Sequence, residues 1–492
     1  MVTTVGPAAR ASSTPRGARA ARSALAALAL PLCAAVARAQ QARDTLVYNV
    51  AIYTRNPHLT IEARLTRSAP GPVSLAAPPN ASPAGTQVAG LVATTDRGTP
   101  LPVQQHGATF VIGSDEAGAI RFRYRLDVQR RVADGSTGTG LDSQRLYAVT
   151  GSVFVAPDPT AYRKTAMPYP VVVVEMLPPA GWEVVTGWPR LGQGFRPVDG
   201  EALLHGTLAA APDFRMYQGS AGGADWQLAI RGSRHFSDST LTAAIGAGLS
   251  LASEAFGRVP VPTVTYTAEV GQKGRMSGSL QGRTSIGLVW EPSEILERPR
   301  THDVFHETVH LWFGGAMETE RWWTEGVTDY VAARLLARWR GRPEDLAALC
   351  FESLRNYQRI EHRFRMTMAE ESRRRIPGDN TEQLVYRKGM LTGLLLDAAI
   401  RRASGGRRSL DDVARSLLAL ASTRRDRHVR EEEIGIAVTA AGGEAAHLVW
   451  TRVAEGTVPL AEPDVADALG VVTGQLFEPP AVNAKIRKEL VR

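Results

Sequence analysis

The chain has 492 residues, of which 44% are hydrophobic and 22% are charged. This composition excludes a disordered or fibrous protein, and the length is sufficient for several domains with cores of their own. The formal net charge is +8, but no basic run interleaved with aromatic residues indicates a nucleic-acid surface. We therefore expect no nucleic-acid partner.

Residues 1–39 have the composition of a targeting segment. They contain five arginines and no acidic residue, and the stretch 23–37 is almost wholly apolar. Small residues follow where a signal peptidase cuts, so we predict a signal cleaved before Gln40 and an exported protein, periplasmic or secreted. An organellar transit peptide, a lipid anchor at Cys33 and an uncleaved anchor are the alternatives.

Cleavage would remove five arginines and lower the formal net charge from +8 to +3, which weakens any argument for an anionic partner. Cys350 would then be the one remaining cysteine, so no intramolecular disulfide is expected. No later stretch is apolar for the roughly 18 residues that a membrane span needs, so no stable membrane insertion is expected after cleavage. The sequence does not indicate an oligomeric state.

Residues 40–235 contain short runs rich in β-branched and aromatic residues, separated by Gly, Pro and Asp clusters. This pattern predicts an N-terminal β-sandwich. The clearest strands are expected at residues 45–54, 120–129, 146–156 and 169–177.

The pattern changes after residue 235. Residues 237–257 begin with Ser and Asp caps and continue with helical periodicity, which predicts a helix. A strand is expected at 262–270, and helices are expected to dominate from there to about residue 475. We predict a catalytic domain over residues 236–400 and a helical C-terminal region over 401–492.

The most informative segment contains His306-Glu307-Thr308-Val309-His310, an H-E-x-x-H motif. Positions four apart share one face of a helix, so both imidazoles can bind one metal ion while Glu307 lies beside them. His302 continues this face, but a fourth ligand would block the open position of a catalytic site, so we expect it in an outer position.

A catalytic zinc site needs a third protein ligand and leaves the fourth position for water. Two carboxylates are candidates, because Glu325 follows His310 after fourteen intervening residues and Asp329 follows after eighteen. They lie four residues apart on one predicted helix and can face the same way. Spacing alone leaves both open.

The segment 322–330, WWTEGVTDY, resembles the W-x-x-E-G-x-x-x-Y segment of gluzincin peptidases, especially the glycyl aminopeptidase type, which is related to aminopeptidase N. The resemblance implies an α+β multidomain chain in which a thermolysin-like α/β catalytic domain follows the β-sandwich and precedes the helical region. It also implies one zinc ion per chain, with Glu325 as the third ligand and Asp329 supporting a zinc-bound histidine. The connection from His310 to Glu325 is shorter than in aminopeptidase N relatives.

Two further segments extend the resemblance. Tyr386 begins a segment similar to the Y-x-K-G of these aminopeptidases, which implies that its hydroxyl stabilises the oxyanion; otherwise a half-buried core tyrosine would be expected. Gly278, Ser279 and Gln281 match an edge strand that pairs with the substrate backbone. In those families a glutamate at the position of Gln281 binds the free amino terminus, and an uncharged amide loses that ion pair.

The sequence thus predicts zinc-dependent hydrolysis of a peptide or protein substrate, aminopeptidase-like in type, with water activated by zinc and Glu307. An endopeptidase without a free-amine requirement is one alternative, and an inactive zinc-containing peptide-binding protein is another. Too few residues follow the helical region for the PDZ domain that is frequent in the glycyl aminopeptidase type.

Overall fold

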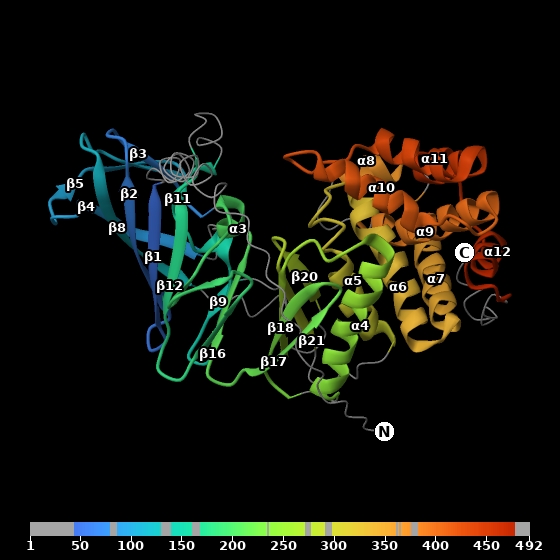
Figure 1. The fold of residues 1–492 in the computed structure, drawn as a ribbon, viewed down its shortest axis with the longest axis horizontal. Coiled ribbons are helices and arrows are strands. Elements are labelled where there is room, and N and C mark those ends of the chain that lie inside the picture. The colour runs from blue at the N-terminus through green and yellow to red at the C-terminus, as the bar shows by residue number, and fades with distance from the viewer. Residues whose placement is uncertain are drawn as a thin grey trace, which may run out of the picture.

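The computed structural model describes residues 44–78, 86–128, 139–159, 168–233, 236–270, 277–290, 298–360, 363, 366–374 and 382–477. The predicted signal segment, residues 1–39, lies outside the described residues, as does Cys33. Figure 1 shows a β-rich half at the N-terminal end of the described chain, a helical half at the other end and a smaller sheet between them.

The β-rich half contains three sheets. The largest has, in spatial order, β14 (Arg190–Leu191), β15 (Gly194–Phe195), β12 (Val171–Leu177), β1 (Thr45–Tyr53), β2 (His58–Arg67), β8 (Gly118–Val128), β4 (Thr86–Thr95) and β5 (Pro100–Leu101). A second has β13 (Glu183–Thr186), β16 (Thr207–Ala211), β10 (Leu146–Val149) and β9 (Gly140–Leu141). The third has β11 (Ala156–Pro157), β3 (Val73–Ala76), β7 (Thr109–Ile112) and β6 (Val103–His106). The short helices η1 (Thr150–Ser152) and α3 (Gly200–Leu204) connect strands.

Alternation of side chains explains these strands. In β8 the apolar residues from Ile120 to Val128 are buried at every second position, and arginines occupy most of the positions between them. The buried Tyr48 and Tyr124 donate hydrogen bonds to the carbonyls of Val155 and Val153, so their hydroxyls are satisfied inside one shared core. The β-rich character of this half, predicted from the sequence, is confirmed.

The smaller sheet has the order β17 (Arg215–Ala221), β18 (Ala224–Ile230), β19 (Thr263–Val270), β21 (Ser285–Trp290) and β20 (Ser277–Gln281). β18, β19 and β21 run parallel, and β20 is an antiparallel strand at the edge. β18 contributes to the core of the helical half, so the change between the two large cores falls near residue 212 and not at the predicted residue 235. The sequence pattern could not show where one core ends and the next begins, because β17 and β18 resemble the preceding strands in composition.

The helical half contains α4 (Asp238–Phe256), α5 (Arg298–Val309), η2 (Trp322–Val327), α6 (Thr328–Arg340), α7 (Pro343–Gln358), α8 (Met368–Arg374), α9 (Glu382–Ser404), α10 (Leu410–Ser422), α11 (Glu431–Val449), η3 (Trp450–Ala454) and α12 (Glu462–Thr473). The predicted helix at 237–257 is confirmed as α4, whose cap Ser237 accepts a hydrogen bond from the Thr240 backbone. All these helices share a core with the smaller sheet, and α9 continues through the predicted boundary at residue 400.

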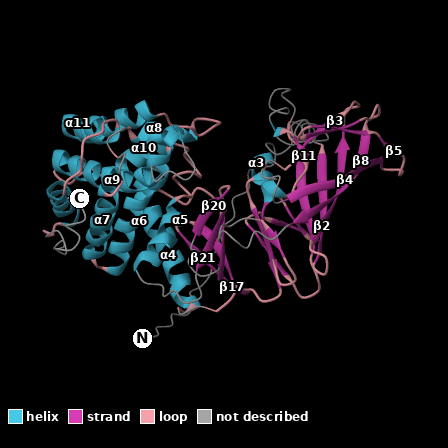
Figure 2. Cartoon of the chain, turned by 180° about the vertical axis from the view of Figure 1, so that it is seen from behind, coloured by secondary structure: helices cyan, strands magenta, loops and turns pink. Residues whose placement is uncertain are grey.

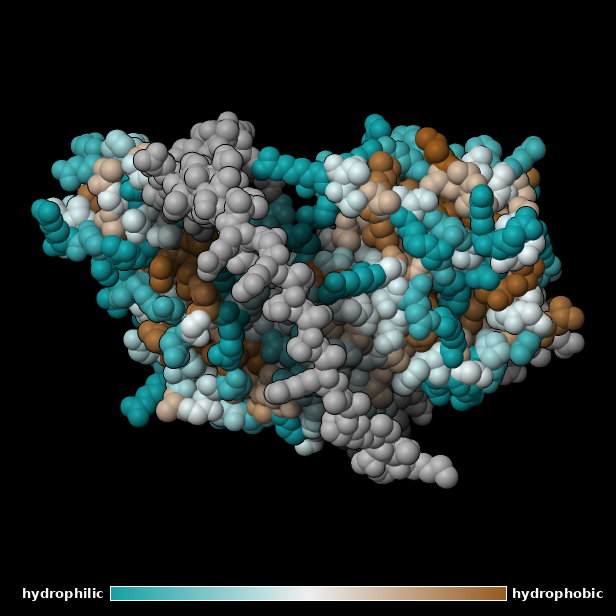
Figure 3. Space-filling model, viewed as in Figure 1, coloured by the Kyte–Doolittle hydropathy of each residue, from teal (hydrophilic) through white to brown (hydrophobic). Residues whose placement is uncertain are grey.

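Figure 2 shows the same arrangement from behind, with the smaller sheet between the strands of one half and the helices of the other. On the face shown in Figure 3, hydrophilic and hydrophobic side chains are mixed over the helical half, and a hollow lies between the two halves. Among the described helices, none combines the length and the apolar character that crossing a bilayer requires.

Candidate metal centre and active site

The two histidines of the motif meet at the end of α5. His306 lies on the last turn of the helix, and the His310 amide continues the turn by donating to the His306 carbonyl at 3.2 Å. Both side chains are buried, and their Nε2 atoms lie 2.9 Å apart. The four-residue spacing therefore brings both imidazoles to one point, as the sequence predicts.

Glu325 reaches the same point from a second segment of the chain. It lies on η2, a π-helical turn that leads directly into α6. Its Oε2 atom is 3.6 Å from His306 Nε2 and 3.5 Å from His310 Nε2. Burial opposes ionisation of Glu325, but the two imidazoles outweigh it and lower the pKa of this carboxyl.

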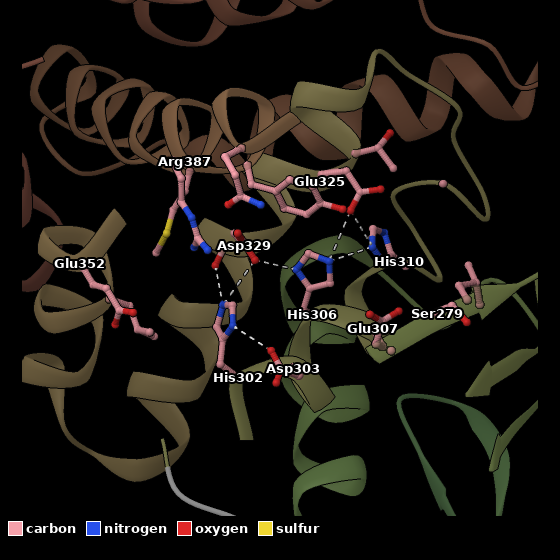
Figure 4. Close-up of a pocket in the computed structure, with 18 of the residues that line it drawn as sticks. Ser279, His302, Asp303, His306, Glu307, His310, Glu325, Asp329, Glu352 and Arg387 are labelled. Atoms are coloured by element: carbon pink, nitrogen blue, oxygen red, sulfur yellow. Dashed lines mark hydrogen bonds and ion pairs between the residues drawn. The ribbon is translucent and has the colours of Figure 1, made fainter. Parts of the chain in front are cut away.

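Asp329 has a different place, one turn further along the same helical segment. Its Oδ1 atom accepts a hydrogen bond from His306 Nδ1 at 2.8 Å, and it does not reach the point where the Nε2 atoms meet. His310 Nδ1 donates to the Phe313 carbonyl at 2.9 Å. Each ring thus has its Nδ1 engaged and its Nε2 directed at Glu325 (Figure 4).

The three residues fit a zinc ion. Donor atoms from His306, His310 and Glu325 all lie within 4.8 Å of one another, and no other group of this kind is found among the described residues. Two imidazole nitrogens and one carboxylate are a ligand set of catalytic zinc sites. Burial works against a charged imidazole at His306, but Asp329 outweighs it and raises the pKa of the ring, which makes it a stronger base.

Glu307 lies beside this group and against the edge strand β20. Its Oε2 atom is buried without a hydrogen-bond partner, and burial raises the pKa of the carboxyl. A Cβ atom on Gly278 would lie 2.5 Å from both Cγ and Oε1 of Glu307, so the carboxylate occupies space that only glycine leaves free. Glu307 can therefore exchange a proton at a position next to the donor cluster.

Tyr386, on α9, lines the same cavity, which has a volume of about 660 Å³. Burial raises the pKa of its hydroxyl, and the adjacent Glu325 carboxylate adds to the shift. The hydroxyl thus keeps its proton near neutral pH and can donate it in a hydrogen bond. The structure places Tyr386 at the cavity and not in the apolar core that its surroundings in sequence would also permit.

The predicted substrate-binding residues of β20 separate into two groups. Gly278 and Ser279 line the cavity, whereas Gln281 is not among its lining residues. The Gln281 amide donates instead to Ser279 Oγ at 3.0 Å. The Gln281 side chain therefore lies along the strand in this structure, and its contact with a substrate stays a prediction.

Other polar residues line the opposite end of the cavity, and the sequence analysis did not identify them. Asp303, Glu352 and Arg387 lie there on three different helices (Figure 4). His302 donates to the Asp329 carbonyl at 3.0 Å, which is the expected outer position. Arg387 occupies the variable position of the Y-x-K-G segment, and no sequence signal marked Asp303 or Glu352.

Comparison with solved structures finds proteins of the same fold, among them a zinc metallopeptidase. An aminopeptidase N family protein from Idiomarina loihiensis aligns over 86% of this chain and 78% of its own length, with a TM-score of 0.72 and 17% identity. The M1 zinc metallopeptidase from Deinococcus radiodurans aligns over 86% and 95%, with a TM-score of 0.55 and 13% identity. Yeast LTA4 hydrolase aligns over 86% and 69%, with a TM-score of 0.54 and 13% identity.

By sequence, no protein-family model matches the chain and no curated protein matches it. The comparison therefore rests on structural similarity. At these sequence identities, structural similarity shows the fold alone. The chain has the multidomain α+β fold of the M1 zinc metallopeptidases, which confirms at the level of fold the resemblance indicated by the sequence motifs.

Proposed function

We propose that this chain is a zinc-dependent peptidase of aminopeptidase type. The observation that carries the proposal is the convergence of His306, His310 and Glu325 in one cavity with a buried, unpaired carboxylate at Glu307. A structural zinc site would need no adjacent base and would be closed by a fourth protein ligand. The fold shared with known zinc metallopeptidases supports the same function.

Each group of the site has its own role in the proposed hydrolysis. Bound zinc supplies a Lewis acid that polarises the scissile carbonyl and lowers the pKa of a water molecule. Glu307 accepts a proton from the attacking water and returns it to the leaving amine. The Tyr386 hydroxyl donates a hydrogen bond to the developing oxyanion, and the exposed edge of β20 pairs with the peptide backbone.

Peptides are the proposed substrate class. One neighbouring structure is described as a variant of the Deinococcus radiodurans M1 zinc metallopeptidase bound to a Tyr-Ser-Ala substrate. By the resemblance noted above, the Gln281 end of β20 lies toward the amino-terminal side of the substrate. We also propose that the protein is exported, and this part rests on the composition of residues 1–39.

Paired peptides test this function. Two peptides that differ only in a free or acetylated amino terminus are incubated with the purified protein, with and without a chelator, and bound metal is measured in parallel. Chelator-sensitive cleavage of the free-amine peptide alone would establish an aminopeptidase, and equal cleavage of both would indicate an endopeptidase. About one zinc per chain without cleavage would favour a binding protein and would overturn the peptidase proposal.

Changing Glu307→Gln separates chemistry from metal binding. We expect the variant to retain zinc, because Glu307 is not in the donor cluster, and to lose at least about a hundredfold in kcat because the base is gone. Metal analysis and initial rates on the same preparation measure the two effects. Turnover close to that of the unaltered protein would remove Glu307 from the mechanism.

A further inference from the structure

A second cavity of about 470 Å³ lies between the β-rich half and the smaller sheet. Its apolar lining comes from Trp188, Pro189 and Val198 on one side and from Pro260, Val261 and Pro262 on the other. The proline rings fix φ, so this part of the lining is rigid. Prolines also lack backbone N–H groups, so the lining offers few hydrogen-bond donors to an occupant. The volume lies within the roughly 300–1,000 Å³ that is usual for ligand sites.

The second cavity adjoins the catalytic cavity. Gly282 and Gly314 line both of them, and neither places a side chain between the two cavities. Gly314 lies next to the metal-binding His310, and Gly282 directly follows β20. A backbone that paired with β20 beside Glu307 and continued past Gln281 would therefore approach the second cavity.

The charges at the border of the second cavity are already compensated. Arg427 is within 3.3 Å of Glu318 and 3.7 Å of Glu201, so it joins the C-terminal helical region to both the catalytic segment and the β-rich half. Arg283 is within 3.2 Å of Asp199. A charged occupant would compete with these pairs, and the chemistry that the cavity favours is apolar.

The apolar lining is incompletely covered by the chain itself. Val198 is 71% exposed although it faces a cavity with tryptophan and proline walls. A mostly apolar cavity of this size next to a catalytic site is typical of a binding site. In addition, Gln281 at the end of β20 carries no charge, and its amide donates a hydrogen bond to Ser279.

We propose that the second cavity binds an apolar segment of the substrate that precedes the scissile bond. The protein then also cleaves bonds that lie two or more residues from the amino terminus, with a preference for apolar residues before the cut. This inference rests on the proposed peptidase function and extends it beyond the terminal residue.

The test uses two acetylated peptides with the same scissile bond and the same residues after it. One carries three apolar residues before the bond and the other carries three small polar residues. We expect kcat/KM to be at least about tenfold higher for the apolar peptide, in line with what apolar pockets discriminate. Val198→Asp should reduce this ratio by about tenfold, since it places a charge in the apolar site.

Leu177→Asp is the matched control, because Leu177 is 55% exposed in the same half of the molecule but does not line the second cavity. It should leave the ratio unchanged. Binding of the acetylated apolar tripeptide to the Glu307→Gln protein, measured by calorimetry, gives a readout that does not need turnover. Val198→Asp should weaken this binding and Leu177→Asp should not.

The outcomes separate the two proposals. Absence of any chelator-sensitive cleavage, with tripeptide binding that still depends on Val198, would sink the peptidase function and retain the binding site. Removal of only the first residue from every peptide, or equal effects of Val198→Asp and Leu177→Asp, would overturn the inference and leave the peptidase function standing.

Discussion

The position of the Glu307 side chain requires a glycine at residue 278 on the facing strand β20. A methyl group on Gly278 would lie 2.5 Å from two atoms of the Glu307 side chain, and this side chain is buried on the last turn of α5. The donor cluster lies close to this carboxylate, since His306, His310 and Glu325 all influence its pKa. The glycine is therefore a positional requirement of the proposed base and not only a feature of the edge strand.

Gly278→Ala should lower kcat by about a hundredfold, since displacing a catalytic group by about 1 Å has effects of this size. Zinc content should stay near one per chain, because no ligand touches Gly278. Ser279→Ala, at the adjacent position on the same strand, should have a much smaller effect on kcat. A Gly278→Ala protein with kcat within twofold of normal would show that Glu307 can relocate without loss.

Asp329 contacts His306, one of the three residues of the donor cluster. Its hydrogen bond to Nδ1 at 2.8 Å orients the ring so that Nε2 faces His310 and Glu325. Asp329→Asn is expected to weaken zinc binding by about 10–100-fold, because outer partners of ligand histidines have effects of this size. Competition with a fluorescent chelator measures the affinity, and an unchanged affinity would contradict the assigned role.

Spacing could predict these two residues, and the choice of Glu325 as the ligand came from the resemblance to gluzincin peptidases. Glu325 and Asp329 are four apart on one helical segment, so their spacing permits either to be the ligand. In the structure the orientation of the His306 ring distinguishes them, and this depends on packing between α5 and α6. Similarly, the side chain of Gln281 could turn outward or along β20, and the hydrogen bond to Ser279 that decides it is invisible in the sequence.

At the scale of elements, η2 and α9 approach each other through two glycines. A Cβ on Gly326 would lie 2.5 Å from Gly389 Cα, and one on Gly389 would lie 2.7 Å from the Trp322 carbonyl. These two elements carry Glu325 and Tyr386, so their close contact fixes the third ligand relative to the hydroxyl. The sequence shows both glycines, but the contact between segments some sixty residues apart comes only from the fold.

Gly389→Ala should therefore destabilise the protein by about 1–3 kcal/mol through overpacking, and it should also lower kcat. Gly246→Ala is the control, because Gly246 lies inside α4 with no atom near its added methyl group. It should be neutral or stabilise by up to about 1 kcal/mol. Chemical denaturation of both variants compares the effects, and equal stabilities would contradict the close contact.

At the scale of the whole molecule, composition and periodicity predicted a β-rich half followed by a helical half. Composition and periodicity could not predict which segments that are distant in the sequence pair with each other. β1 pairs in parallel with β12 across more than a hundred residues, and β17 and β18 join the sheet of the helical half. Strand register depends on which face each strand buries, and the strands here have similar compositions.

The metal site is attached to a large core, and this determines what metal removal should do. His306 lies on α5, His310 directly follows α5, and Glu325 lies on η2. α5 and η2 pack with α4, α6 and α9 around many buried aromatic residues. Small zinc domains unfold without metal because the ion replaces a core. Here the core does not depend on the ion, so chelation should abolish hydrolysis while the far-ultraviolet circular dichroism spectrum stays unchanged.

Zinc should still raise the melting temperature, because a ligand that binds only the folded state stabilises it by about 4 kcal/mol at a thousandfold excess over its Kd. His310→Ala removes one donor and should reduce this response strongly, while its metal-free melting temperature should stay close to that of the metal-free parent or fall modestly. Thermal scans of both proteins with and without zinc make the comparison. Loss of helical signal on chelation would instead mean that α5 and η2 need the ion to stay in place, and the site would then be part of what holds the helical half together.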